Sequence, residues 1–303
     1  MHADAPASPP IGLPALEQRL AHDLACLGWP ARPWMPAQPP VDGLPVLDVA
    51  IIGAGQAGMA VAACLAQNGI HAVLFDRQGA GLEGPWATTA RMETLRSPKE
   101  LTGPALGLPA LTFRAWYEAQ FGAAGWTALD KIPRLQWMDY LRWYRRVMAL
   151  DVRNHTAVVA VLPRADSRVL LHLRAAGADS RVLARRVVLA TGRDGLGGPA
   201  VPAFMDGIPP QLWAHSSDEL DHSRLAGLRV AVVGAGSSAM DSAATALECG
   251  ARSVDLLIRR DDLVTGGPEA ACETHHGVLA QEGCGGRELQ IEPLDVGPEL
   301  RDR

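Results

Sequence analysis

The sequence predicts an α/β protein with two doubly wound domains and a small β-meander in the first of them. Two observations predict the domains: an apolar run, a glycine-rich turn and a helix pattern follow one another near residue 50 and again near residue 230. A third observation, three short strand patterns after the first of these units, predicts the meander. The expected segments are a proline-rich N-terminal extension at 1–45, a first domain at 46–198, a linker and second domain at 199–262, and an irregular tail at 263–303.

The first strand–turn–helix unit has the spacing of a dinucleotide-binding (Rossmann-like) motif. A strand pattern at 49–52 is followed by a helix pattern at 59–68 and a second strand pattern at 71–75, which ends at Asp76. The glycines of the turn are Gly53, Gly55 and Gly58. In such a unit the first glycine makes the tight turn, the second lets a pyrophosphate approach the helix N-terminus, and the acid binds a ribose hydroxyl. Asp76 therefore favours FAD or NAD over NADP, and we include the adjacent Arg77 in the expected FAD site.

The second unit has the same order but ends with the opposite charge. Its strand pattern at 230–233 leads to a helix pattern at 240–249 and a second strand pattern at 254–258, after which come Arg259 and Arg260. The turn contains the expected cofactor-binding residues Gly234, Gly236, Ser237 and Ser238. Two arginines at this place suit the 2′-phosphate of NADPH. Glycine turns can also serve only to pack a helix on a sheet, but the strand and helix patterns around both turns favour nucleotide sites.

Composition narrows the range of functions. The 303 residues, 48% of them hydrophobic, are enough for two domains with cores, and the net charge of −5 argues against a nucleic-acid partner. The five cysteines are scattered without a CxxC motif, which favours a reducing cytoplasm and counts against the pyridine-nucleotide disulfide reductases, which share the two-nucleotide layout. There is no signal-peptide pattern and no apolar run of the roughly 20 residues that a membrane span needs, so we expect a soluble protein with no membrane partner. The sequence leaves the oligomeric state open.

The remaining segments connect the two units. Leucines at helical spacing over 14–27 predict a docked helix, and a helix with one apolar stripe is predicted over 135–150. The long segment 81–113 has no sustained period, and a loop of that length inside a domain is usually functional. The strand patterns of the meander and the strand after it lie at 157–162, 168–174, 181–184 and 186–190.

The order of these parts resembles the class B flavoprotein monooxygenases over residues 47 to 262. In that family a strand ending in Ala-Thr-Gly lies beside the FAD, and the matching residues here are Ala190, Thr191 and Gly192. The segment Glu83-Gly84-Pro85-Trp86, with Thr88 and Arg91 after it, resembles the loop that covers the isoalloxazine ring. The resemblance therefore implies that Trp86 and Arg91 contact FAD. The alternative is that Trp86 only caps the core.

The segment Trp213-Ala-His215-Ser216-Ser217 resembles the His-Ser element that lies at the nicotinamide side in this family. The resemblance implies that His215 and Ser216 contact NADP, and a structural role is the alternative for His215. Baeyer–Villiger members of the family carry a tryptophan where this chain has Glu219. That departure leaves the ketone-oxidising subclass in doubt.

The family resemblance implies that the cofactors, FAD and NADPH, carry the chemistry. NADPH would reduce FAD, a C4a-peroxyflavin would form with O2, and one oxygen atom would pass to a small-molecule nucleophile at nitrogen or sulfur, or to a carbonyl. No side chain is named as catalytic. One alternative is an NADPH-dependent flavin reductase or oxidase that does not oxygenate a substrate. Another is a C-terminally truncated nucleotide-binding remnant without activity, because family members continue past the second domain and return to the first.

The tail after Arg260 is the least informative part of the sequence. It lacks both apolar periods and is rich in glycine, proline and charge, so we expect it to be poorly ordered. Its cysteines and histidines could be read as metal ligands, but their spacing fits no standard zinc pattern and no metal site is expected. These residues are Cys272, His275, His276 and Cys284.

Overall fold

The computed structural model describes residues 11–192, 195, 197–258 and 288–293. The chain divides into two compact units. The first unit comprises the residues up to Thr88 together with 97–198, and the second comprises 89–96 together with the residues from Pro199 onward. The short segment 89–96 therefore belongs to the second unit although both of its flanks belong to the first.

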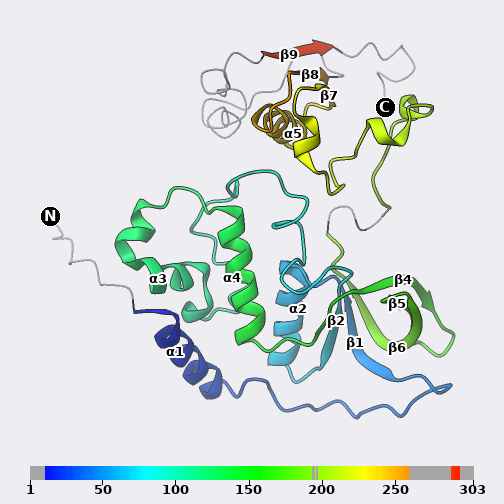
Figure 1. Ribbon diagram of the computed structural model, residues 1–303. Coiled ribbons are helices and arrows are strands. Elements are labelled where there is room, and N and C mark those ends of the chain that lie inside the picture. Colours follow the sequence, from blue (N-terminus) through cyan, green and yellow to red (C-terminus); the bar gives the residue numbers. More distant parts are fainter. Residues whose placement is uncertain (1–10, 193–194, 196, 259–287, 294–303) are drawn as a thin grey trace. The chain divides into compact units, whose positions relative to one another are not determined.

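The first unit is built on one mixed sheet (Figure 1). Its strands are β1 (Val46–Ile52), β2 (Ala72–Phe75), β3 (Val152–Arg153), β4 (Thr156–Pro163), β5 (Val169–Ala175) and β6 (Ala178–Leu189). They lie in the order β3-β2-β1-β6-β5-β4, with the first four parallel and the last two joined as antiparallel neighbours. The helix α2 (Gln56–Gln67) follows β1 and packs on β1 and β2. This arrangement confirms the predicted α/β strand–turn–helix–strand unit with a β-meander, although a helix covers only one face of the sheet and the meander covers the other.

Strand β6 joins the parallel and antiparallel parts of the sheet. It pairs with β5 over residues 178–184 and with β1 over residues 183–189. The sequence predicted two separate strands here, and that prediction was wrong. The polar pair that begins at Arg185 interrupts the apolar pattern, but the backbone ladder to β1 continues past it and keeps the strand intact.

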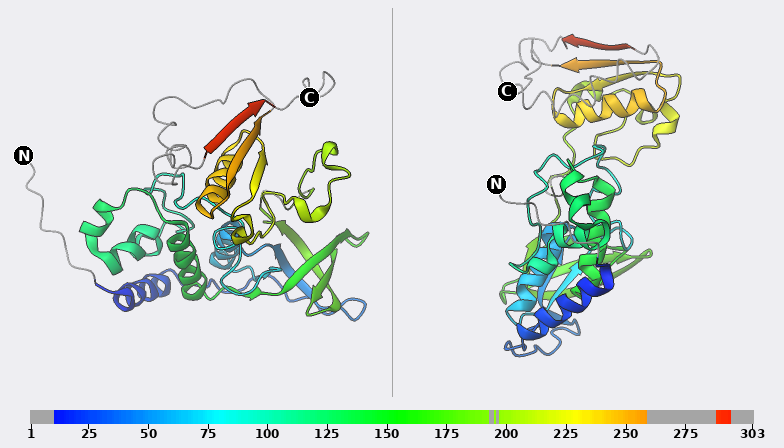
Figure 2. Two further views of the ribbon diagram at one scale, coloured as in Figure 1. Left: turned by 45° about the horizontal axis from the view of Figure 1, so that its top comes forward. Right: turned by 90° about the vertical axis from the view of Figure 1, so that its left-hand side faces the viewer.

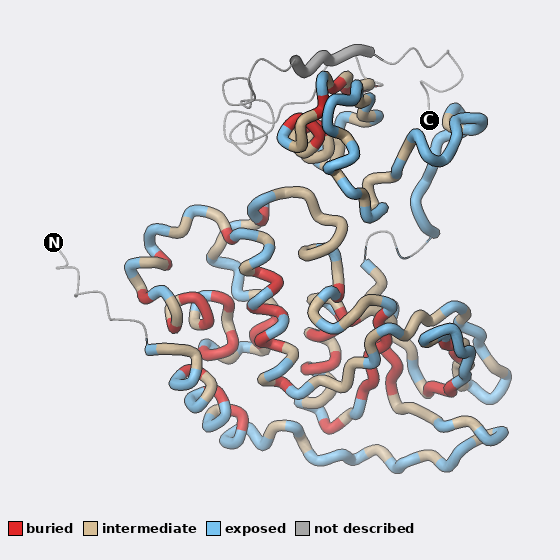
Figure 3. Tube along the Cα trace, viewed as in Figure 1, coloured by how far each residue is buried: buried red, intermediate tan, exposed pale blue. Residues whose placement is uncertain are grey.

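The central strands β1 and β2 bury consecutive residues (Figure 3), so both faces of this sheet are covered. Ile51 and Leu74 are fully buried on the face that α2 covers. The opposite face is filled by side chains of β1, β2, β5 and β6, because the meander brings its own apolar residues onto that face. These residues are Ala50, Val73, Phe75, Leu171, Leu173, Val182 and Ala184.

The remaining helices of the first unit are α1 (Leu13–Cys26), the short 3₁₀ helix η1 (Pro109–Leu111), α3 (Phe113–Ala128) and α4 (Arg134–Val147). Helix α1 buries Leu16, Leu20 and Leu24 and packs on α3 and η1. This is the docking that its leucine spacing predicted, except that Leu27 lies beyond the helix and is 56% exposed. No helix among the described residues is both long enough and apolar enough to cross a membrane.

Helix α3 was not predicted from the sequence. It begins after Thr112, whose hydroxyl accepts a hydrogen bond from the Ala115 backbone N–H at 3.1 Å, and it is kinked at Gly122, where φ is 71°. The kink breaks the helical period in the sequence. Five aromatic side chains of α3 and α4 pack against the buried ring of Phe113, so the helix is held by packing that no local pattern reveals. 

The second unit repeats the strand–turn–helix–strand order on a separate sheet (Figure 2). Its elements are β7 (Arg229–Val233), α5 (Ser237–Glu248), β8 (Ser253–Ile258) and β9 (Glu288–Pro293), with the 3₁₀ helices η2 (Ala203–Met205), η3 (Pro210–Leu212) and η4 (His222–Leu225) before them. The three strands are parallel in the order β7-β8-β9. Helix α5 packs on β7 and β8 through Ala243, Ala246 and Leu247. The prediction that the two glycine units lie on separate sheets is confirmed.

Strand β9 corrects the expectation of an irregular tail. Residues 288–293 form a strand that pairs with β8 from Ser253 to Ile258. The alternation of Leu289 and Ile291 with polar residues is too short to stand out in a glycine-rich segment. Other predictions for the tail, including the four cysteines and histidines from Cys272 to Cys284, lie outside the described residues.

Candidate dinucleotide-binding sites

The first glycine turn has no room for a side chain at two of its glycines, Gly53 and Gly58. At Gly53, where φ is 100°, an added Cβ would overlap the carbonyl oxygen of Ala190. At Gly58 an added Cβ would overlap the carbonyl oxygen of Gly53. The Gly53 N–H donates to the Phe75 carbonyl at 2.8 Å, which ties the turn to the end of β2. These two positions need glycine because backbone packs on backbone there.

The same turn is open at Gly55, the residue that caps the N-terminus of α2. Gly55 has no capping side chain, and the nearest atom to an added Cβ would be the Cα of Gly84 at 3.5 Å, an ordinary contact. The first backbone N–H groups of a helix have no partners within the helix and attract an anion. The turn therefore fits a pyrophosphate group, as a bound dinucleotide such as FAD requires.

Asp76 holds this turn in shape. It is 8% exposed, and its two carboxylate oxygens accept hydrogen bonds from the backbone N–H groups of Ala54 and Gln78, both at 2.8 Å. Each carboxylate oxygen can accept more than one hydrogen bond, so Asp76 can still receive a ribose hydroxyl. Its neighbour Arg77 is exposed.

The strand that ends in Ala-Thr-Gly reaches the turn as expected. The Ala190 N–H donates to the Ile52 carbonyl at 2.8 Å, which places Ala190 and Thr191 directly beside Gly53. Gly192 follows in a left-handed conformation with φ of 76°. The structure thus brings both segments together at the carboxyl ends of neighbouring parallel strands, where α/β proteins bind their ligands.

The loop from Gly81 to Trp86 lies against the same turn through the contact of Gly84 with Gly55. Trp86 is half-buried, and its carbonyl accepts a hydrogen bond from Arg134 Nη1 at 2.6 Å. The Thr88 hydroxyl donates to the Gly84 carbonyl at 2.9 Å. Both readings of Trp86, as a flavin contact or as a cap on the core, stay predictions.

Arg91 belongs to the second unit, and its hydrogen bonds are made within that unit, while its expected contact with FAD stays a prediction. Its Nη1 donates to the Ser216 carbonyl at 2.7 Å, and its Nε donates to His222 Nε2 at 3.2 Å. Burial lowers the pKa of Arg91, and burial together with the charge of Arg91 lowers the pKa of His222, which favours the neutral ring that accepts this hydrogen bond. Sequence reasoning missed His222, since a single histidine before a glycine turn carries no signal.

His215 forms a local turn. Its Nδ1 lies 2.7 Å from the Ser217 hydroxyl, and its backbone N–H donates to Asp218 Oδ2 at 2.7 Å. Ser216 is held through its carbonyl by Arg91. The expected contact of His215 and Ser216 with NADP stays a prediction.

The second glycine turn has the same construction as the first. The Gly234 N–H donates to the Leu257 carbonyl at 2.9 Å, and Gly236 caps the N-terminus of α5 with no atom within 4 Å of an added Cβ. Ser237 and Ser238 begin the helix, and Ser237 is exposed. This open helix N-terminus also fits a dinucleotide pyrophosphate.

The register of the two sheets shows which residue takes the place of the acid in the second unit. Ile52 pairs with Phe75, and Val233 pairs with Leu257, so Asp76 corresponds to the residue after Leu257. That residue is Ile258, which is 3% exposed. The second unit therefore has no carboxylate where the first has Asp76. The predicted phosphate ligands, Arg259 and Arg260, lie outside the described residues.

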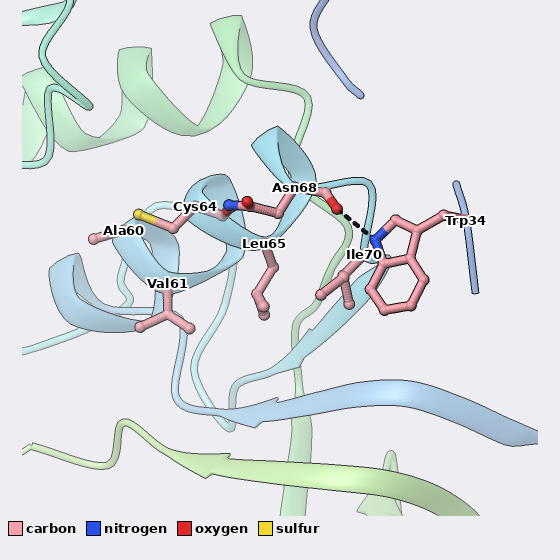
Figure 4. Close-up of a pocket in the computed structure, with 7 residues that line it drawn as sticks. All are labelled: Trp34, Ala60, Val61, Cys64, Leu65, Asn68 and Ile70. Carbon is pink, nitrogen blue, oxygen red and sulfur yellow. Dashed lines mark hydrogen bonds between the residues drawn. The ribbon is translucent and has the colours of Figure 1, made fainter. Parts of the chain in front are cut away.

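A cavity of about 460 Å³ lies at the other end of α2 (Figure 4). It forms where the N-terminal extension crosses the helix, and the indole N–H of Trp34 donates to the Asn68 carbonyl at 2.8 Å there. Its lining comes from Trp34, from α2 between Ala60 and Leu65, and from the residues after the helix, and it includes no residue of the glycine turn. The lining residues are Trp34, Ala60, Val61, Cys64, Leu65, Asn68 and Ile70.

Comparisons with known proteins place these sites in context. The sequence profile of the family described as "Pyridine nucleotide-disulphide oxidoreductase" matches residues 47–284. A FAD-dependent urate hydroxylase of Xanthomonas campestris pv. campestris is 47% identical over 253 residues, which cover 82% of this chain and 53% of that protein. The chain spans about half the length of the curated relatives it matches.

Solved structures share the fold at low sequence identity. The cadaverine monooxygenase DfoA of Erwinia amylovora, bound to FAD, is 15% identical with a TM-score of 0.62, and the match covers 82% of this chain and 69% of that one. The bacillithiol disulfide reductase Bdr of Bacillus cereus is 20% identical with a TM-score of 0.57, covering 82% of this chain and 68% of that one. Because a monooxygenase and a disulfide reductase both share it, the fold by itself does not select the reaction.

Proposed function

We propose that this chain, which belongs to the pyridine nucleotide-disulphide oxidoreductase family, is the nucleotide-binding part of an FAD- and NADPH-dependent monooxygenase. The observation that carries the FAD assignment is the first glycine turn, which is closed at Gly53 and Gly58 and open at Gly55. Bound FAD would supply the redox and oxygen chemistry. The chain's own residues would bind it: the N-terminus of α2 at the pyrophosphate and Asp76 at a ribose.

The second unit is proposed to bind NADPH. A carboxylate at the end of the second strand would repel a 2′-phosphate, and here the corresponding residue is Ile258. Arg259 and Arg260 follow it in the sequence and offer charge-assisted hydrogen bonds to that phosphate. The family's name, which refers to pyridine nucleotides, supports the same assignment.

Urate or a related purine is the proposed substrate. The FAD-dependent urate hydroxylase of Xanthomonas campestris supports this proposal, because it is 47% identical to this chain over 253 residues, which cover 82% of the chain. Oxygen transfer to a nitrogen or a sulfur atom of another small molecule remains an alternative to urate. All of them use O2 and an electron-rich substrate. The scattered cysteines, of which Cys26, Cys64 and Cys249 are free, favour a reducing cytoplasm as the compartment.

Disulfide reduction is the least favoured reaction for this member of the family. That chemistry needs a redox-active cysteine pair, and the sequence has no CxxC motif. The family match thus supports the two proposed nucleotide sites, and the missing motif argues against disulfide reduction. A flavin reductase or oxidase that does not oxygenate a substrate remains the second candidate, and a binding remnant without activity is the third.

The test is an assay of the purified protein with FAD, NADPH and urate in air. A monooxygenase consumes urate and NADPH in a one-to-one ratio and releases little hydrogen peroxide. An oxidase consumes NADPH at the same rate with and without urate and releases one hydrogen peroxide for each NADPH. Yellow protein that consumes no NADPH contradicts both enzyme proposals and leaves the binding remnant.

A further inference from the structure

A buried carboxylate lies in the loop that contacts the first glycine turn. Glu83 is 3% exposed. Its Oε2 accepts the Gly81 backbone N–H at 2.8 Å, and its Oε1 accepts Asn154 Nδ2 at 2.7 Å and pairs with Nη1 of Arg145 on α4. A carboxylate persists at this depth only when its charge is paired and its oxygens are hydrogen-bonded. The three donors therefore fix Glu83 in one position.

Fixing Glu83 also fixes the residue after it. Gly84 is the nearest neighbour to the open side of Gly55. The other end of the loop is also held by α4, because Arg142 donates to the Gly81 carbonyl from Nε at 3.0 Å and from Nη2 at 2.7 Å. Helix α4 thus holds the loop in place over the N-terminus of α2. Among the described residues of the loop, Glu83 is the buried acid that pairs with α4.

We propose that Glu83 and Arg145 form a positioning pair for FAD, an inference that rests on the proposed FAD site. The pair holds Gly84 where the space at Gly55 stays open to the pyrophosphate. Arg145 also neutralises Glu83, which otherwise would add a buried negative charge next to a site for two phosphates. The pair acts through the loop, so neither residue touches the reacting atoms.

The test is titration of the full-length apoprotein with FAD, read by flavin fluorescence and by the rise in melting temperature on FAD binding. Arg145→Met leaves Glu83 buried without its cation, so the dissociation constant for FAD should rise roughly tenfold or more. Arg146→Met is the control, because Arg146 is the next residue of α4 and loses an ion pair, to Glu17, that is more exposed and does not involve the loop. Its affinity for FAD should stay within about twofold of the original.

If Arg145 acts by neutralising the charge of Glu83, removing both charges should restore part of the affinity for FAD. The double variant Glu83→Gln with Arg145→Met removes both charges and should bind FAD more tightly than Arg145→Met alone, and Arg145→Lys should retain most of the affinity. If Arg145→Met is insoluble, Asn154→Asp sets a like charge against Glu83 and should weaken FAD binding in the same assay.

NADP⁺ binding to the second unit gives the internal reference. Loss of FAD affinity with unchanged NADP⁺ affinity supports the positioning pair, whereas parallel loss of both shows general destabilisation and overturns it. Equal FAD affinity in Arg145→Met and Arg146→Met also overturns it. Failure of the original protein to bind FAD refutes the proposed function instead, so the two failures are distinguishable.

Discussion

The three glycines of the first turn are required for different reasons. Gly53 and Gly58 lie where an added Cβ would meet a backbone carbonyl oxygen, so they are needed for packing whether or not a cofactor binds. Gly55 has only Gly84 near an added Cβ, so the space left by its missing side chain is available to a ligand. The sequence predicted all three as one motif, and only the structure separates the packing positions from the binding position.

This difference predicts opposite results for two alanine substitutions. Gly58→Ala should lower the free energy of unfolding of the apoprotein by about 1–3 kcal/mol, because the start of α2 must move away from the turn. Gly55→Ala should cost about 1 kcal/mol or less, as expected for alanine at an N-cap, and should still weaken FAD binding by blocking the approach of the pyrophosphate. Urea denaturation and FAD titration measure the two effects. A Gly55→Ala protein with unchanged FAD affinity would contradict the site.

At the scale of elements, tertiary packing decides what the sequence pattern leaves undetermined. Helices α1, α2, α4 and α5 could be predicted because their apolar residues recur with a helical period. Helix α3 could not, because Gly122 kinks it and its stability comes from aromatic contacts with α4. The arginines at 185 and 186 led the sequence pattern to predict two strands where β6 is one, because its pairing with β1 keeps it continuous. Local patterns thus predict an element only when nothing distant overrides them.

The docking of α1 gives a test at this scale. Leu20 is 1% exposed on the helix that packs on α3 and η1, whereas Leu27 is exposed just after that helix. Leu20→Ala should lower the free energy of unfolding by about 2–5 kcal/mol, since it leaves a cavity under α1. Leu27→Ala should change it by no more than about 0.5 kcal/mol. Thermal unfolding of both variants measures the difference, and equal melting temperatures would show that α1 does not stabilise the first unit.

At the scale of the whole molecule, the same strand–turn–helix–strand unit occurs twice, and the two copies differ in the residues at the end of the second strand. Both units join a strand to a helix through a glycine turn whose first N–H bonds the end of the second strand. The sequence predicted this repetition because the motif is local. It did not predict that the residue matching Asp76 is Ile258, since that depends on the register between neighbouring strands. Nor did it predict that Arg91 belongs to the second unit, because that placement depends on contacts with residues more than 100 positions away.

The difference between the two endings predicts the choice of nicotinamide cofactor. Replacing Arg259 and Arg260 by alanine should raise the Michaelis constant for NADPH roughly tenfold or more, because each charge-assisted hydrogen bond to the 2′-phosphate contributes about 1.5–3 kcal/mol. The constant for NADH should change little. Arg252→Ala is the matched control, because Arg252 is exposed at the opposite end of β8. Steady-state kinetics with both cofactors measure the effect, and equal losses for NADPH and NADH would refute this assignment.

The segment 89–96 limits how this architecture can be recombined. Within the second unit, Arg96 donates to Asp241 of α5 at 2.6 Å and Arg91 donates to the Ser216 carbonyl. The chain therefore contributes two separate segments to the second unit, a short one at 89–96 and the main one from Pro199 onward. A gene fragment that starts at Pro199 would encode the second glycine turn without Arg91 and Arg96, which bond the Ser216 carbonyl and Asp241 of that unit. Exchange of the second unit between homologues consequently needs three junctions, after Thr88, after Arg96 and after Gly198, instead of one.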